Sequence, residues 1–175
     1  MTAVSSFASA AEGAGASEAG AFTAALTSVV DVVKVKAEKL NDPTAAAADK
    51  KIDFSKATDL DLIKAKVADE AQKVATAEGS SGFDKTALSN LVNATTTSIK
   101  NVNDQIKTVT DLTSDASKNV FSTMQVLAEQ VKTAAVAEKA SKGTGTSSIE
   151  FTDAAKVNTA ASNAAPKDLT LSSNA

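Results

Sequence analysis

Residues 114–142 read SDASKNVFSTMQVLAEQVKTAAVAEKASK, and this stretch decides the fold class. Its apolar side chains recur at steps of four, three, four and three residues, at Val120, Met124, Leu127, Val131 and Ala134. Such spacing places them on one face of an α-helix that packs against a core. Ser114 is a suitable N-cap, Lys139 lies in the last turn where the helix dipole favours positive charge, and Gly143 can end the helix.

A second amphipathic stretch runs from Ser17 to about residue 40. Ser17 is its predicted N-cap, and Glu18 lies in the first turn, where the dipole favours a carboxylate. The large apolar residues form a one-sided helical stripe that consists of Phe22, Leu26, Val29, Val33 and Leu40. Pro43 follows and ends the helix, because proline disfavours α-helical geometry in the residue before it.

Two more helices are predicted between residues 58 and 112. The first begins near Thr58 and stops at Gly79, the start of a Gly-Ser-Ser-Gly breaker cluster. Its apolar face consists of Leu60, Ile63, Val67, Ala71 and Val74. The second follows the cap Asp84 and runs to about residue 112. Its apolar face consists of Leu88, Val92, Ile99, Val102, Ile106 and Val109, with Thr95 in the same register.

Four helices with this spacing predict an all-α fold, an antiparallel bundle of about four helices over residues 17–142. Its core is expected around Val29, Val67, Val102 and Leu127. A long parallel coiled coil fits the sequence less well, because the proline and the glycine cluster interrupt the apolar stripe.

The segments on either side of the bundle differ from it in composition. Residues 1–16 are small and low in complexity, and we predict a flexible N-terminal segment there. Residues 143–175 begin with Gly-Thr-Gly and alternate apolar and polar side chains at 148–152 and again at 168–172. This pattern predicts a linker, a short helix and the start of an extended strand.

Composition excludes most enzyme classes. The 175 residues include no His, Cys, Trp, Tyr or Arg, so all 18 basic residues are Lys. The commonest metal ligands, the His general base and the Cys nucleophile are therefore missing. A net charge of −3 and the lack of Arg disfavour nucleic-acid binding. No run approaches the ~20 apolar residues of a membrane span. We predict no enzyme, no cofactor, no nucleic-acid partner and no membrane span.

Aspartate clusters are the remaining candidates for chemistry. Asp53, Asp59 and Asp61 lie close together near a helix start, but they lack the alternating pattern and central glycine of a calcium loop. A solvated helix start explains them more simply. Asp111 and Asp115 flank a corner, and nothing nearby indicates the burial that acid–base catalysis requires.

The other polar candidates are weaker. A nucleophilic Ser without His requires a Lys as its base, and Ser141 with Lys142 lies in a Gly-flanked linker. Lys34, Lys36 and Lys39 are interpreted as solvated surface. The sequence therefore predicts no catalytic, cofactor-binding or metal-binding residue.

The most informative motif is NAAPKDLTLSSNA at residues 163–175. It resembles a phrase, N-x-A-P-x-D-(Leu/Ile)-x-L-S-x-N, that opens the first strand of cadherin-like repeats in giant bacterial surface proteins. The matching residues are Asn163, Ala165, Pro166, Asp168, Leu169, Leu171, Ser172 and Asn174. The Ala/Thr-rich stretch before it resembles the helical segments that precede such repeats, so the resemblance covers roughly residues 84–175.

The resemblance implies a non-enzymatic role outside the cell or at its surface. In that family the helical segment belongs to a long, repetitive secreted adhesin or surface-layer-like protein, typically exported by a type I system. The calcium-binding residues of a full repeat would follow Ala175, so none is carried over. We expect a structural spacer module that contacts other domains, other copies of the same protein or cell-surface components.

A self-assembling filament or surface-lattice subunit is the alternative. Flagellin-like chains share the absence of Cys and Trp, the bias to Ala, Ser, Thr and Asn, and the long helices. The segment 148–175 would then exchange as a strand between subunits. Sedimentation distinguishes the two, because a spacer stays monomeric at high concentration whereas a filament subunit pellets.

Overall fold

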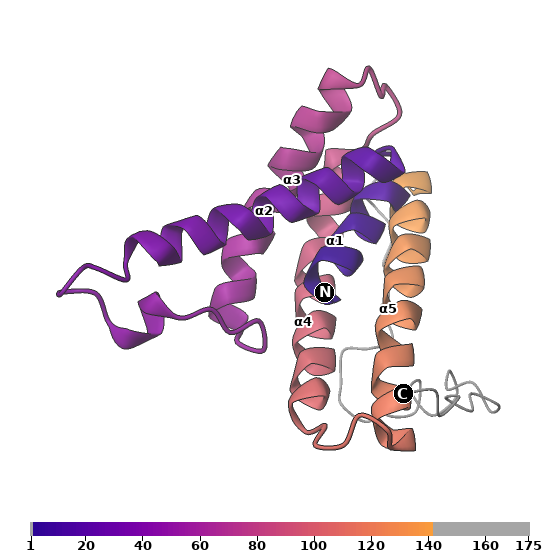
Figure 1. Ribbon diagram of the computed structural model, residues 1–175. Coiled ribbons are helices and arrows are strands. Elements are labelled where there is room, and N and C mark those ends of the chain that lie inside the picture. Colours follow the sequence, from indigo (N-terminus) through magenta and orange to yellow (C-terminus); the bar gives the residue numbers. More distant parts are fainter. Residues whose placement is uncertain (1, 142–175) are drawn as a thin grey trace.

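The computed structural model describes residues 2–141, apart from the side chains of Ala116 and Val120. Residues 2–141 form five α-helices, one short 3-10 helix and no strand. The elements are α1 (Thr2–Gly13), α2 (Glu18–Glu38), η1 (Ala47–Lys50), α3 (Ala57–Ala77), α4 (Lys85–Lys107) and α5 (Asp115–Ala140) (Figure 1). The prediction of an all-α bundle is confirmed. The predictions for residues 142–175, and for the Val120 side chain, lie outside the described residues.

Three helices begin at their predicted caps. The side-chain oxygens of Ser17, Asp84 and Ser114 accept hydrogen bonds from the backbone N–H three residues later, at 2.9, 3.0 and 3.2 Å. Each bond satisfies a backbone donor that has no partner within the helix, in α2, α4 and α5 respectively. α4 ends at Lys107 instead of near residue 112, because Thr108 already forms its C-cap.

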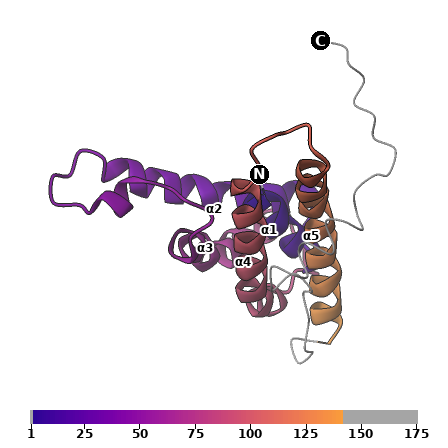
Figure 2. The same ribbon diagram turned by 90° about the horizontal axis from the view of Figure 1, so that it is seen from below.

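α4 and α5 form an antiparallel pair, and α1 packs against both (Figure 1, Figure 2). α1 also contacts α2 and α3, so it is the central helix of residues 2–141. This arrangement corrects the flexible segment expected for residues 1–16. Phe7 is completely buried, and Ala3, Ala10 and Ala11 are buried beside it.

Small residues explain why α1 fits between its neighbours. Gly13 has no side chain, and a Cβ added there would lie against the Lys132 carbonyl oxygen and 2.6 Å from the Ala135 Cβ on α5. The two backbones therefore approach more closely than an alanine would allow. A segment rich in Ala, Ser and Gly can form either a flexible linker or a helix that packs tightly on its neighbours. Residues 2–13 form such a helix, because α4 and α5 pack against it.

α2 faces the bundle with its small residues, which corrects the core predicted for this helix. Its buried positions are Gly20, Ala21, Ala24, Ala25, Ser28, Val32 and Lys36. Phe22, Leu26, Val33 and Leu40 of the predicted stripe are exposed, and Val29 is half-buried. Because the distance between packed helices depends on the side chains at the contact, small residues let α2 lie close to α1 and α3.

The other three predicted stripes form the core. Val67, Val102 and Leu127 are completely buried, and Val29 packs against the same cluster from its edge. Thr95 occupies its predicted place in α4 and is completely buried, and its hydroxyl has no hydrogen-bond partner in the described part of the chain.

Candidate interaction surface

The outward face of α2 carries a row of apolar side chains, which we call the outer stripe. It consists of Ala19, Phe22, Leu26, Val30, Val33 and Ala37, all exposed and spaced three or four residues apart. Phe22 is 50% exposed, and Leu26, Val30 and Val33 are 42%, 39% and 41% exposed. The six residues span about five turns of helix, and the exposed Glu18 and Lys34 border them.

Single exposed apolar residues are common on soluble proteins, whereas contiguous apolar patches mark interaction sites. α2 packs against α1, α3 and η1, all on the opposite or lateral side of the helix. Its C-terminal half extends beyond the other α-helices, with the short η1 helix beside its end (Figure 1). The outer stripe is therefore accessible along a helix of 21 residues.

A groove borders the outer stripe at its N-terminal end. α1 contributes Ser5, Ala8 and Glu12 to this groove, and α2 contributes Glu18 and Phe22. Its volume is about 600 Å³. The surface beside Phe22 is therefore concave. A partner that lies along α2 can also insert a side chain into this groove.

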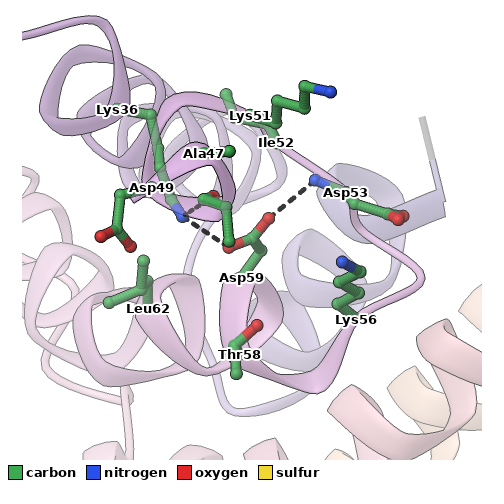
Figure 3. Close-up of a pocket in the computed structure, with 11 residues that line it drawn as sticks. Lys36, Ala47, Asp49, Lys51, Ile52, Asp53, Lys56, Thr58, Asp59 and Leu62 are labelled. Carbon is green, nitrogen blue, oxygen red and sulfur yellow. Dashed lines mark hydrogen bonds and ion pairs between the residues drawn. The ribbon is translucent and has the colours of Figure 1, made fainter. Parts of the chain in front are cut away.

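A buried ion pair fixes the other end of α2 to α3. Lys36 Nζ lies 2.9 Å from Asp59 Oδ1, and the two side chains are 11% and 6% exposed. Lys36 also donates to the Ala48 carbonyl oxygen at 3.2 Å, and Asp59 Oδ2 accepts from the Asp53 backbone N–H at 2.7 Å (Figure 3). Each buried charge thus has a second partner, which offsets part of its desolvation cost. The pair holds α2, the η1 loop and α3 together.

This ion pair corrects two interpretations of the sequence. Lys36 is not solvated surface, and Asp59 is not part of a solvated helix start. Charged residues are rarely buried unless paired, and no sequence spacing indicates that these two residues meet. An open hollow of about 850 Å³ lies beside the pair, and the side chains of Lys51, Lys56 and Leu62 line it (Figure 3).

The three aspartates considered for calcium do not converge. Hydrogen bonds from Ser55 and Lys107 hold the pKa of Asp53 well below its usual range, and Lys107 Nζ lies 3.0 Å from its carboxylate. Asp61 instead pairs with Lys64 at 2.6 Å. The third aspartate belongs to the buried pair. Among residues 2–141, no group of three His, Cys, Asp or Glu residues is placed to hold a metal ion.

The second pair of aspartates also forms separate local contacts. Asp111 accepts hydrogen bonds from the hydroxyl and the backbone N–H of Thr113, at 2.7 and 2.9 Å, and these bonds lower its pKa. Asp115 pairs with Lys118 at 3.0 Å. Both carboxylates are exposed, so they lack the burial that acid–base catalysis requires. Lys142 of the Ser–Lys candidate lies outside the described residues.

The sequence predicts Phe22, Leu26 and Val33 of the outer stripe to lie in the core, because together with Val29 they follow steps of four, three and four residues. The sequence does contain a signal against that assignment. Ala21, Ala24, Ala25 and Ser28 form a second face of small residues at the same spacing, on the other side of α2. A helix with two such faces can bury either, and only its neighbours decide which.

Comparisons with protein-family models, with curated proteins and with solved structures found no match. Within the described range, none of the helices combines the length and the apolar character that crossing a bilayer requires. The functional assignment consequently rests on the residues and their arrangement.

Proposed function

We propose that this chain is a non-enzymatic structural module that acts through protein–protein contacts made by the outer stripe of α2. The observation that carries the proposal is the row of large apolar side chains along an accessible face of α2. Burying such a row against a partner removes apolar surface from water, which is the main driving force of protein association.

The rest of the molecule supports such a role. The small-residue face packs α2 closely on α1 and α3, and the Lys36–Asp59 pair fixes its far end. The outer stripe is therefore presented on a supported helix, and binding needs little further ordering of the backbone.

We further propose that the module belongs to an extracellular or cell-surface bacterial protein of the adhesin type. The support is the resemblance of residues 163–175 to the opening of a cadherin-like repeat, together with the Ala/Thr-rich helices before it. The test is a blot of source cells with an antibody against residues 84–140. We expect the signal in the surface or medium fraction, in a band far above 17.7 kDa. A band only in the cytosolic fraction contradicts the assignment.

Site-specific photo-crosslinking tests the contact surface. A photoreactive amino acid replaces Leu26 in the protein produced in its source cells, and a second variant carries it at Lys73, an exposed residue on α3. We expect a crosslinked product from position 26 and none from position 73. Absence of any product from position 26 would contradict the proposed function. A product that sediments as a large polymer would instead favour the filament or lattice subunit.

A further inference from the structure

We propose that the outer stripe binds the outer stripe of a second copy of this chain, with the two α2 helices antiparallel. This inference rests on the proposed function and names its partner. The sequence predicts a spacer that stays monomeric, whereas this inference predicts a dimer. The dimer is closed, because a two-fold contact uses the same surface on both copies.

The spacing of the outer stripe indicates that its partner is a helix. Apolar positions three and four residues apart present a seam that the side chains of a second helix can interdigitate with. A second α2 provides a seam of the same length and spacing. The contact would extend along most of the helix, which is ~32 Å long at 1.5 Å per residue.

The distribution of large and small side chains favours the antiparallel arrangement. When Leu26 of one copy lies opposite Val33 of the other, Phe22 lies opposite Ala37, and the two Val30 side chains lie beside each other near the two-fold axis. The largest side chain then meets the smallest, as in well-packed cores. A parallel arrangement would place two Phe22 rings against each other and leave a gap between two alanines.

The available area predicts a weak but specific dimer. Half of Phe22 and about two fifths of Leu26, Val30 and Val33 are exposed. With flanking side chains and backbone, two copies would bury on the order of 1,000 Å², the lower limit for a specific interface. Interfaces near this limit are typical of weak, transient complexes.

Sedimentation equilibrium of the full 175-residue chain tests the dimer. Leu26→Asp changes the outer stripe, and Val136→Asp is the control, because Val136 on α5 is 53% exposed and lies outside the stripe. We expect a wild-type dimer, at least a tenfold weaker dimer for Leu26→Asp, and a change within about twofold for Val136→Asp. Circular dichroism verifies that both variants remain folded.

Single introduced cysteines test the orientation, since the chain has no native thiol. In the antiparallel register, Val30→Cys lies next to its own copy, whereas two copies of Phe22→Cys lie ~22 Å apart, beyond the reach of a disulfide. We expect oxidation to produce a covalent dimer for Val30→Cys and none for Phe22→Cys. Equal crosslinking of both variants overturns the antiparallel arrangement.

Three further results distinguish a failure of this inference from a failure of the proposed function. A purified chain that stays monomeric, combined with a photo-crosslink from position 26 to a different protein, refutes the second copy but retains the contact surface. A dimer that Leu26→Asp does not weaken shows that copies meet elsewhere. The absence of any photo-crosslink from position 26 refutes the proposed function itself.

Discussion

α1 and α2 follow each other in the chain and share an Ala-rich composition around one phenylalanine, yet they differ in burial. Phe7 in α1 is completely buried, whereas Phe22 in α2 is half exposed. α1 has α2, α4 and α5 around it, while α2 packs on α1 and α3 along one side. Hydrophobic content alone therefore does not determine which of the two side chains enters the core.

The comparison shows the effect of small residues on helix contact. In both helices the closest contacts use Gly, Ala and Ser, because these side chains let backbones approach. In α1 the large residue fills space that the surrounding helices enclose. In α2 the large residues lie on the side that no other element among residues 2–141 covers, where they are available to a partner.

Truncation of each phenylalanine gives the largest expected difference between the two helices. Phe7→Ala should lower the free energy of unfolding by about 3–5 kcal/mol, because it leaves a cavity in the core. Phe22→Ala should lower it by about 1 kcal/mol, because half of that ring is exposed already. Urea unfolding followed by circular dichroism, at low protein concentration, measures both. Equal effects would show that Phe22 is part of the core.

Two ion pairs between α2 and α3 give the next comparison. The Lys36–Asp59 pair is buried, whereas Lys66 and Asp31 form a pair at 3.2 Å that is about one third exposed. Asp59→Ala leaves a buried lysine without its charge partner and should cost about 3–5 kcal/mol.

Asp31→Ala serves as the control for that experiment, and it should cost about 1 kcal/mol or less. The same urea titration measures this variant, and added salt should reduce its effect further. A cost for Asp31→Ala as large as that for Asp59→Ala would contradict the role assigned to the buried pair.

Glycine substitutions test the close contact of α1 with α5. Gly13→Ala should lower the free energy of unfolding by about 1–3 kcal/mol, because the added Cβ meets the backbone of Lys132 and the side chain of Ala135. Gly82→Ala is the control, since a Cβ there has only the Lys139 Nζ nearby, at 3.6 Å. A neutral Gly13→Ala variant would indicate that α1 can move away from α5.

A small effect of pH on stability is expected from Asp53, in the loop before α3. Hydrogen bonds from Ser55 and Lys107 lower the pKa of Asp53 in the folded chain. A lowered pKa means that the stabilisation is complete above the unfolded value of about 3.9 and is lost as the pH falls below it. The difference in unfolding free energy between wild type and Asp53→Asn should therefore be constant near neutral pH and decrease in acid. A difference that does not change with pH would contradict this origin.

Several elements were predictable because their signals are local. The caps Ser17, Asp84 and Ser114 need only residues within one turn, and the breakers at Pro43 and Gly79 act on their own neighbours. Most of the stripe residues of α3, α4 and α5 were also predicted correctly, because each of these helices has one clearly more apolar face; Val109, by contrast, lies beyond the end of α4.

The remaining features depend on residues that are distant in the chain. Lys36 and Asp59 are both charged, and each alone predicts a solvated position. Lys36 and Asp59 form a buried ion pair only because α2 packs against α3. The helix over residues 2–13 was missed for a related reason, since its small residues acquire a role only when α4 and α5 lie against them.

By itself, the amino-acid sequence determined that the chain is helical, where α2, α4 and α5 are capped, and which stripes of α3, α4 and α5 are buried. Tertiary structure alone decided that α1 is the central helix and that the outer stripe, with Phe22 and Leu26, remains exposed. The physical reason is that hydrogen bonding and helical periodicity act over a few residues, whereas burial depends on which surfaces come together. Where two faces of one helix are both apolar, the helices that pack against it determine which face is buried.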